Sequence, residues 1–284
     1  MTERLADVGA RIAGVRQLGE VVNAMRGIAA ARAQQAHAQV IAVDRYAASI
    51  AAAIGRVLSL LPVDPQGPAR APGPLALVLF CAEQGFAGAF SDRVLDAAGP
   101  DLSTATLFVA GARGGVALAA RQIEPSWIGA LPSHSPGLPR LATTIATALY
   151  ARLAAGGIHR LDAIFCQWQP GQGVRIVRHT LFPLDRATLP APADLNLPLL
   201  NLPPSVLLQG LTADYLHAQL CHAALHSFAA ENEARMVAMT AAHTQTDRQL
   251  AELQATQRRV RQEEITAEII ELAAGEAASR ERSG

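Results

Sequence analysis

The sequence predicts an α/β fold in which a small α/β domain is inserted between two long helices that pair as an antiparallel coiled coil. Three observations lead to this prediction. Residues 205–272 contain no proline and a single glycine, Gly210. The first 58 residues repeat apolar side chains at helical spacing. Between these two segments, short apolar runs alternate with helical stretches, which is the pattern of an α/β domain.

Residues 1–61 form the predicted N-terminal helix. Gly14, Gly19 and Gly27 each cost about 1 kcal/mol relative to alanine inside a helix, so they indicate either close helix approach or a pliant stretch. We expect the helix to end before Pro62, where a loop rich in proline and glycine begins. The apolar residues recur at three- and four-residue steps, which is typical of a narrow coiled-coil seam: Leu5, Val8, Ile12, Val15, Val22, Met25 and Ile28.

Residues 205–284 form the predicted C-terminal helix and its tail. A continuous helix over residues 205–275 would be roughly 100 Å long, which exceeds what a globular domain of this size can enclose. Only antiparallel pairing with the N-terminal helix lets both helices cover their apolar faces. Several seam positions are small or polar, among them Asn232, Thr246 and Gln257. A seam this weak indicates a helical pair that is surrounded by other protein.

Residues 75–182 form the predicted α/β domain, and residues 183–204 form a proline-rich linker back to the last helix. Pro170-Gly171-Gln172-Gly173 lies between two apolar runs and is a hairpin signal. The expected strands are Leu75–Phe80, Thr106–Ala110, Leu161–Trp168 and Val174–Phe182. The expected helices are Asp92–Ala98, a short one after Gly115, and Leu141–Ala155.

Composition excludes several classes of function. The net charge is zero, so the chain lacks the basic footprint of a nucleic-acid or membrane-surface binder. All 24 positively charged residues are arginine. The absence of lysine excludes a Walker A phosphate loop and any Schiff-base mechanism.

The cysteines and the N-terminus predict a soluble cytoplasmic chain. Cys81, Cys166 and Cys221 are widely spaced in apolar or helical stretches, which favours buried free thiols in a reducing compartment. The N-terminus is charged and has no apolar region, so we expect no signal peptide. The longest apolar stretch, residues 47–61, is interrupted by Arg56 and is too short to span a bilayer.

Candidate catalytic and binding motifs are weak. Residues 111–115 and 83–88 are glycine-containing loops after strands, but tight βα turns need glycine for backbone reasons alone. His222 and His226 lie four residues apart, near His217 and Cys221, at a spacing that can bind zinc. Because no glutamate lies between them as in zincins, we interpret them as solvated or interface histidines. We predict no catalytic residue, cofactor or metal, and a solvated acidic helix face at Glu263, Glu264, Glu268 and Glu271.

Six motifs, in order along the chain, resemble the gamma subunit family of F-type ATP synthases. The strongest is the run from Glu231 to Met239, which resembles a family segment that ends in R-M-V-A-M. Residues 261–269 resemble the family's R-Q-x-x-I-T-x-E segment. The other matches are residues 11–15, 24–32, 83–88 and 111–114, so the resemblance covers essentially the whole chain.

The resemblance implies a rotary central-stalk subunit that couples rotation of a membrane ion-translocating ring to ATP synthesis or hydrolysis on a surrounding alpha/beta hexamer. Its implied partners are the alpha and beta subunits, the epsilon subunit and the membrane c-ring, with catalysis on beta. The implied location is peripheral, at the cytoplasmic face of the cell membrane. The residues implied to contact the alpha/beta hexamer are Met25, Arg26, Arg261, Gln262 and Glu271. Those implied to contact the ring or epsilon are Glu83, Gln84 and Asn201.

Departures from the family pattern indicate a divergent or alternative F-type complex. Gly27 stands where the family has a methionine, and Asn23 where it has a lysine. The other positions that depart from the pattern are Leu200, Asn201, Ala267 and Ile270. The sequence leaves two alternative functions to consider. A static coiled-coil scaffold with a docking domain requires a stronger seam than this one. A small α/β enzyme requires a convergent catalytic set, which the sequence does not reveal.

Overall fold

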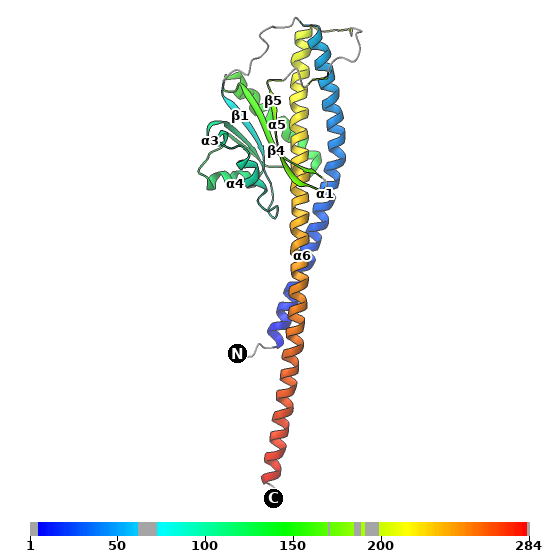
Figure 1. The fold of residues 1–284 in the computed structure, drawn as a ribbon, viewed down its shortest axis with the longest axis vertical. Helices are drawn as coiled ribbons and strands as arrows, with labels where there is room; N and C mark the ends of the chain where they lie inside the picture. Colours follow the sequence, from blue (N-terminus) through cyan, green and yellow to red (C-terminus); the bar gives the residue numbers. More distant parts are fainter. Residues whose placement is uncertain (1–4, 62–72, 170, 185–188, 191–198, 283–284) are drawn as a thin grey trace. The chain divides into compact units, whose positions relative to one another are not determined.

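A computed structural model describes residues 5–61, 73–169, 171–184, 189–190 and 199–282 of the 284-residue chain. Two long helices, α1 and α6, precede and follow an α/β part in the sequence (Figure 1). The elements are α1 Leu5–Ser59, β1 Leu75–Phe80, α2 Phe90–Asp96, α3 Asp101–Thr104, β2 Thr106–Ala110, α4 Ala112–Ala120, β3 Trp127–Gly129, the 3-10 turn η1 Ser135–Gly137, α5 Leu138–Ala154, β4 Arg160–Gln169, β5 Gly173–Phe182 and α6 Pro204–Arg282.

The chain divides into two compact units, and both long helices contribute to each. The first unit combines residues 1–28 with 236–284, and the second comprises residues 29–235. Each unit is described separately below.

The first unit is an antiparallel helical pair. A side chain on Gly9 would meet Gln257 at 4.0 Å, and one on Gly19 would meet Thr246 at 3.5 Å. As residue numbers rise along α1 they fall along α6, which is the antiparallel arrangement that the sequence predicts. The start of α1 therefore lies near Val260, which is the last buried residue of α6 among the side chains that the structure describes. The other buried apolar residues of this pair are Val8, Ile12, Val22 and Met239.

The second unit is built on a five-stranded mixed sheet with strand order β3-β2-β1-β4-β5. β1 pairs in parallel with β2 and with β4, and β2 pairs in parallel with β3. The β4–β5 hairpin is antiparallel. The parallel strands are apolar on both faces, which requires helices on both sides of the sheet.

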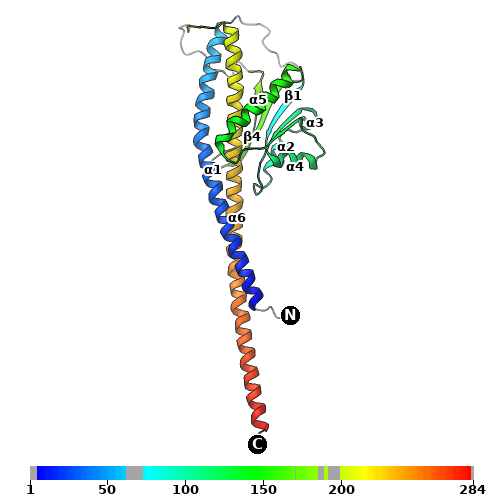
Figure 2. The same ribbon diagram turned by 180° about the vertical axis from the view of Figure 1, so that it is seen from behind.

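Helices cover both faces of this sheet, and α5 and α2 lie on opposite sides of it (Figure 2). On one face, Ala76, Val78 and Phe80 of β1 pack with α5 and with residues of α1 and α6. On the other face, Leu77 and Leu79 pack with α2 and α4. The strand's two-residue period therefore sends alternate side chains into two separate cores.

The elements agree closely with the sequence prediction. β1 and β2 have the predicted bounds, and α5 begins three residues earlier than predicted, at Leu138, because Pro139 fits the first turn of a helix. The helix α6 continues past Gly275 to Arg282. Sequence reasoning missed β3, α3 and η1, which have only three or four residues each. Most of the predicted 62–74 loop and 183–204 linker lies outside the described residues.

A buried carboxylate joins the hairpin to the rest of the second unit. Asp162 on β4 is 2% exposed. It accepts hydrogen bonds from Arg178 of β5 at 2.7 Å and from Arg160 at 3.2 Å. Arg178 also pairs with Asp101 of α3 at 2.7 Å. This network fixes α3 against the β4–β5 hairpin.

Candidate functional site

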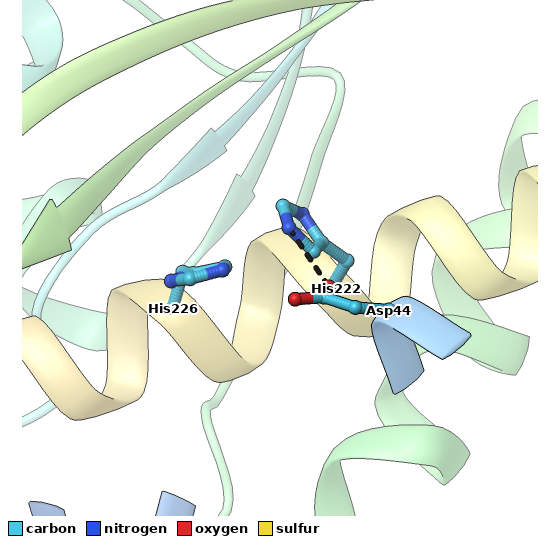
Figure 3. Close-up of side chains that lie close together, drawn as sticks. All are labelled: Asp44, His222 and His226. Carbon is cyan, nitrogen blue, oxygen red and sulfur yellow. Dashed lines mark ion pairs between the residues drawn. The ribbon is translucent and has the colours of Figure 1, made fainter. Parts of the chain in front are cut away.

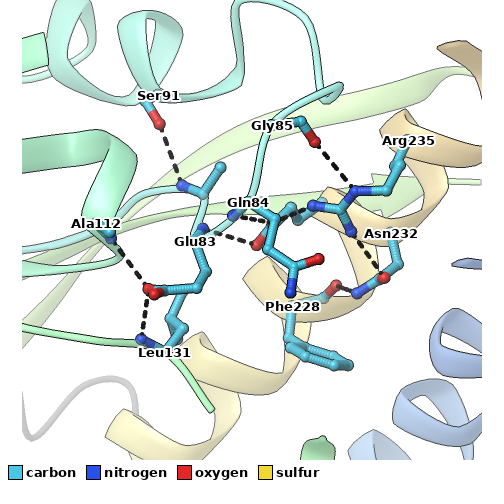
Figure 4. A network of polar contacts seen from close by, with 11 residues as sticks. Glu83, Gln84, Gly85, Ser91, Ala112, Leu131, Phe228, Asn232 and Arg235 are labelled. Carbon is cyan, nitrogen blue, oxygen red and sulfur yellow. Dashed lines mark hydrogen bonds and ion pairs between the residues drawn. The ribbon is translucent and has the colours of Figure 1, made fainter. Parts of the chain in front are cut away.

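The α6 run that carries the strongest family resemblance contains three buried polar residues. Glu231, Asn232 and Arg235 are 3%, 1% and 5% exposed. A charged residue is rarely buried unless it is paired. These three residues, named here the α6 clamp, are all satisfied by contacts within the second unit (Figure 4).

Glu231 connects α6 to the loop that follows β1. Its carboxylate accepts hydrogen bonds from the backbone N–H groups of Glu83 at 3.2 Å and Gln84 at 3.1 Å. The same carboxylate forms an ion pair with Arg235, one helical turn further along α6. The Glu231 carboxylate thus supplies the hydrogen-bond acceptor for two backbone N–H groups of the loop, which bond no backbone carbonyl among the described residues.

Arg235 completes the α6 clamp. Its Nε donates to the carbonyl of Gly85 at 3.1 Å, and its Nη1 donates to Oδ1 of Asn232 at 3.0 Å. Asn232 in turn donates from Nδ2 to the carbonyl of Phe228 at 2.8 Å. Charge-assisted bonds of this kind are about twice as strong as neutral ones, so the loop at residues 83–85 is held firmly against α6.

Glu83 organises the other side of the same loop. Its Oε2 accepts from the backbone N–H of Ala112, at the start of α4, at 3.0 Å. It also accepts from the N–H of Leu131 at 2.8 Å. A carboxylate at a helix N-terminus is favoured by the helix dipole. The position where a phosphate would bind at the 111–115 loop is therefore occupied by the chain's own carboxylate.

Gly111 explains why that loop contains glycine. Its φ is +109°, which residues with side chains rarely adopt, and a Cβ there would lie 2.4 Å from the carbonyl oxygen of Cys81. The glycine serves backbone geometry, in agreement with the interpretation of the sequence.

The residues predicted to contact the hexamer lie in the first unit, at separate places along the helical pair. Met25 and Arg26 are partly exposed on α1, and Arg26 donates to Oδ1 of Asn23 at 2.7 Å. Arg261 and Gln262 are exposed on α6, beyond the last buried seam residue. The antiparallel register places Arg261 near the start of α1, far along the helix from Arg26. Glu271 is also exposed on α6.

The residues predicted to contact the ring or epsilon lie in the second unit. Gln84 and Asn201 are exposed, whereas Glu83 is partly buried and its carboxylate bonds within the chain. Sequence reasoning did not assign a role to Glu231 or Arg235. The available signal was that Glu231 and Arg235 carry opposite charges one turn apart on α6, directly after a stretch of mostly apolar and small residues at 223–230.

Apolar side chains on α6 continue beyond Val260, the last buried residue among the described side chains of this helix. Every described side chain from Arg261 to Gly275 is exposed. Among them Ile265, Ile269, Ile270 and Leu272 are 48%, 60%, 64% and 74% exposed. Exposed apolar residues gathered along one helix mark a contact surface for another protein. The acidic residues of this segment are exposed as expected.

The histidines of α6 are more buried than the sequence indicated. His226 is 8% exposed, and both His222 and His226 pack on the ring of Phe165. Burial, with the nearby rings of His222 and His37, lowers the pKa of His226 to about 4. Burial also lowers the pKa of His222, although the Asp44 carboxylate opposes this shift. Both imidazoles are therefore neutral at pH 7.

The chain matches a known family over almost its whole length. The family model described as ATP synthase matches residues 4–278. A protein named ATP synthase gamma chain from Solibacter usitatus is 27% identical, over 97% of this chain and 99% of its own. One of the same name from a Parafrankia species is 28% identical, over 97% of each chain. The chain belongs to the ATP synthase gamma-chain family.

Solved structures agree with the family at the level of the fold. A chain in the rotor of the Euglena gracilis mitochondrial ATP synthase has a TM-score of 0.62 at 12% identity, covering 92% of this chain and 98% of its own. A second Euglena structure, described as containing OSCP, F1 and the c-ring, gives 0.63 at 10% identity, covering 96% and 94%. Among the described residues, no helix combines the length and apolar content needed to cross a membrane.

Proposed function

We propose that this chain is the rotary central-stalk subunit of an F-type ATP synthase. It couples rotation of a membrane ion-translocating ring to ATP synthesis or hydrolysis on an alpha/beta hexamer. The observation that carries the proposal is the gamma-chain family match over residues 4–278, which includes both long helices and the α/β domain. A rotating asymmetric rod acts by favouring a different conformation of each surrounding subunit, which is a population shift driven mechanically.

The contacts of the second unit support a role in torque transmission. Torque between an α/β domain and a helix requires a joint that resists shear. The α6 clamp supplies such a joint, because Glu231 and Arg235 bond three consecutive residues of the 83–85 loop. Hydrogen bonds with fixed directions resist sliding better than apolar packing alone.

The exposed part of α6 supports contact with the hexamer. Arg261, Gln262 and Glu271 lie in the segment whose apolar residues have no cover from the described part of the chain. We assign these three residues, with Met25 and Arg26, to the surface that meets alpha and beta. Glu83, Gln84 and Asn201 are assigned to the surface that meets the c-ring or epsilon, with Glu83 shaping the loop that presents Gln84. We infer that the complex lies at the cytoplasmic face of the cell membrane.

The test is rotation of this chain within the assembled hexamer. The three native cysteines are buried, so Ser103→Cys, at an exposed position on α3, provides a selective attachment point for a gold bead. The chain is assembled with the alpha and beta subunits of its own complex, and the bead is followed during ATP hydrolysis. We expect rotation in one direction that stops when ATP is withdrawn. A chain that leaves the hexamer active but shows no rotation refutes the proposal.

Photo-crosslinking tests the surface assignments. A photoreactive amino acid at Gln262 is expected to capture alpha or beta, and one at Gln84 to capture epsilon or the c-ring subunit. Thr104, exposed on α3 and outside both surfaces, is the control position. Exchange of the two capture patterns would show that the surfaces are assigned to the wrong partners.

A further inference from the structure

Three potential metal ligands from two helices converge in the second unit. Asp44 lies on α1, and His222 and His226 lie one turn apart on α6 (Figure 3). Oδ1 of Asp44 is 3.3 Å from Nε2 of His222, and the two imidazole ring centroids are 4.3 Å apart. One ligand atom from each residue lies within 4.8 Å of the others. Two nitrogens and one carboxylate oxygen thus lie close together.

The contact between the Asp44 carboxylate and His222 accounts for only part of this arrangement. It gives no role to His226, whose ring stands beside that of His222 without a hydrogen bond between them in the described structure. His222 also has a buried Nδ1 that lacks a hydrogen-bond partner. A buried imidazole nitrogen without a partner is unfavourable, because it has lost its hydrogen bond to water and gained none in the protein. A cation bound among the three ligand atoms would give His226 a partner that the contact between Asp44 and His222 does not supply.

The geometry points to a zinc site formed by Asp44, His222 and His226, and we propose that bound Zn²⁺ pins α1 to α6 within the second unit. Zinc takes imidazole nitrogens and carboxylate oxygens at about 2.0 to 2.2 Å in tetrahedral sites. Histidines at four-residue spacing on one helix face are a recurrent zinc-binding pair. The fourth position would be filled by water.

The ligands can close to coordination distance with small rotations. Tetrahedral ligands at zinc lie roughly 3.4 Å apart, a value that follows from the bond lengths. The widest separation between the ligand atoms is at most 4.8 Å, so it must shrink by at most about 1.4 Å. The side chain of Asp44 is 48% exposed and is free to adjust. The histidines are held by Phe165, with centroid distances of 5.6 Å and 6.1 Å. The site therefore combines a fixed histidine pair with an adaptable carboxylate.

The role of the ion would be structural. No described glutamate lies between the two histidines in the manner of a zinc hydrolase, and the two helices supply all three ligands. A cross-link between α1 and α6 resists their separation and sliding at the level of Asp44. This inference does not depend on the proposed rotary function, because a helical pair of any function could be pinned in this way.

The test is metal binding to the full-length chain after treatment with a chelator. Co²⁺ replaces zinc as a spectroscopic probe, and Zn²⁺ affinity is measured by competition with a chromophoric chelator. We expect one equivalent of metal per chain and the visible absorption of tetrahedral Co²⁺. Asp44→Ala, His222→Ala and His226→Ala should each weaken Zn²⁺ binding by about 10-fold or more, since even the loss of an outer-shell partner costs about 10- to 100-fold.

The matched control is His243→Ala. His243 and Asp247 form an exposed pair at the same spacing on α6, at 3.0 Å, without a second histidine. This variant should keep the full affinity. Asp44→Ala keeps the test decisive if a histidine variant fails to fold, because Asp44 contributes little to the core. Absence of stoichiometric binding to the wild-type chain, or unchanged binding by Asp44→Ala, overturns the zinc site.

Discussion

Glu231 and Arg235 form a buried ion pair one turn apart on α6, and each also bonds the loop that follows β1. The pair therefore joins a helix and a loop that are about 150 residues apart in the sequence. Neither charge is accessible to solvent, so the geometry of the loop depends on both partners being present.

The first prediction concerns the stability of this joint. Glu231→Ala leaves Arg235 buried without its partner and removes the acceptor of two loop amides. The free energy of unfolding should fall by about 3 to 5 kcal/mol. Urea unfolding followed by tryptophan fluorescence measures it, since both tryptophans, Trp127 and Trp168, lie in the second unit. Glu252→Ala, at an exposed position on α6, should change stability by less than about 0.5 kcal/mol. Equal effects of the two variants would contradict the assigned role of Glu231.

The second prediction concerns Arg261. Its side chain is exposed in the isolated chain, so Arg261→Ala should leave the fold and its stability unchanged. In the assembled complex, loss of a charge-assisted bond should weaken coupling, by about 1.5 to 3 kcal/mol of contact energy. ATPase activity and ion pumping of the reconstituted complex are the measurements. Arg248→Ala, which removes a charge elsewhere on exposed α6, is the control. Normal turnover and pumping in Arg261→Ala would remove Arg261 from the contact surface.

The third prediction concerns Gly27. A side chain there would meet nothing within 4 Å, so this glycine does not serve close approach to α6. Gly27→Met should remove a helix-interior glycine and stabilise the helix by about 1 kcal/mol. We expect normal assembly and retained or raised coupled activity, because the new side chain adds packing beside Arg26. Gly14→Met is the control, because a side chain there also meets nothing within 4 Å. It should stiffen the helix in the same way without adding a side chain beside Arg26. A block of assembly by Gly27→Met alone would show that the hexamer needs the small residue.

A related, smaller effect is expected at Arg26. It is only partly buried, and its described partner is Asn23 at 2.7 Å. Exposed ion pairs contribute about 0 to 1 kcal/mol each, so Arg26→Ala should lower coupling efficiency modestly. Loss of more than about 90% of coupled activity in this variant would mean that Arg26 acts in a buried contact of the assembly.

The fourth prediction concerns the three free thiols. Burial raises the pKa of Cys81 and Cys166 to about 12 and that of Cys221 to about 11. The thiolate is the reactive form, so a raised pKa means a smaller reactive fraction at pH 8. Iodoacetamide should label none of them in the folded chain at that pH and all three in urea, as counted by mass spectrometry. Labelling of the folded chain at the rate of free cysteine would contradict the burial.

The fifth prediction concerns nucleotide. Because Glu83 occupies the N-terminus of α4 and the chain contains no lysine, we expect no saturable ATP binding tighter than about millimolar by the isolated chain. Titration with a fluorescent ATP analogue measures it, and the alpha/beta hexamer is the positive control. Tight binding by the chain alone would revive the small α/β enzyme as its function.

The sequence predicted the long helices and the main strands because their periodicity repeats over many residues. Leu75–Phe80 and Thr106–Ala110 were found with their bounds because buried parallel strands are continuous apolar runs. Trp127–Gly129 was missed because three residues are too few for a pattern. The family motifs likewise carried the function without the structure.

The tertiary structure alone decided the roles of individual polar residues. Glu231 and Glu271 are both glutamates on α6, yet one is 3% exposed and the other lies in solvent. The local sequence predicts that a residue lies in a helix and on which face of the helix it lies. Whether that face is buried depends on which distant segment packs on it. Glu83 bonds Glu231, and Asp44 approaches His222. In both contacts the two residues are more than 100 positions apart in the sequence. Contacts of that separation arise only when the chain folds, because they depend on the positions of whole elements rather than on neighbouring residues.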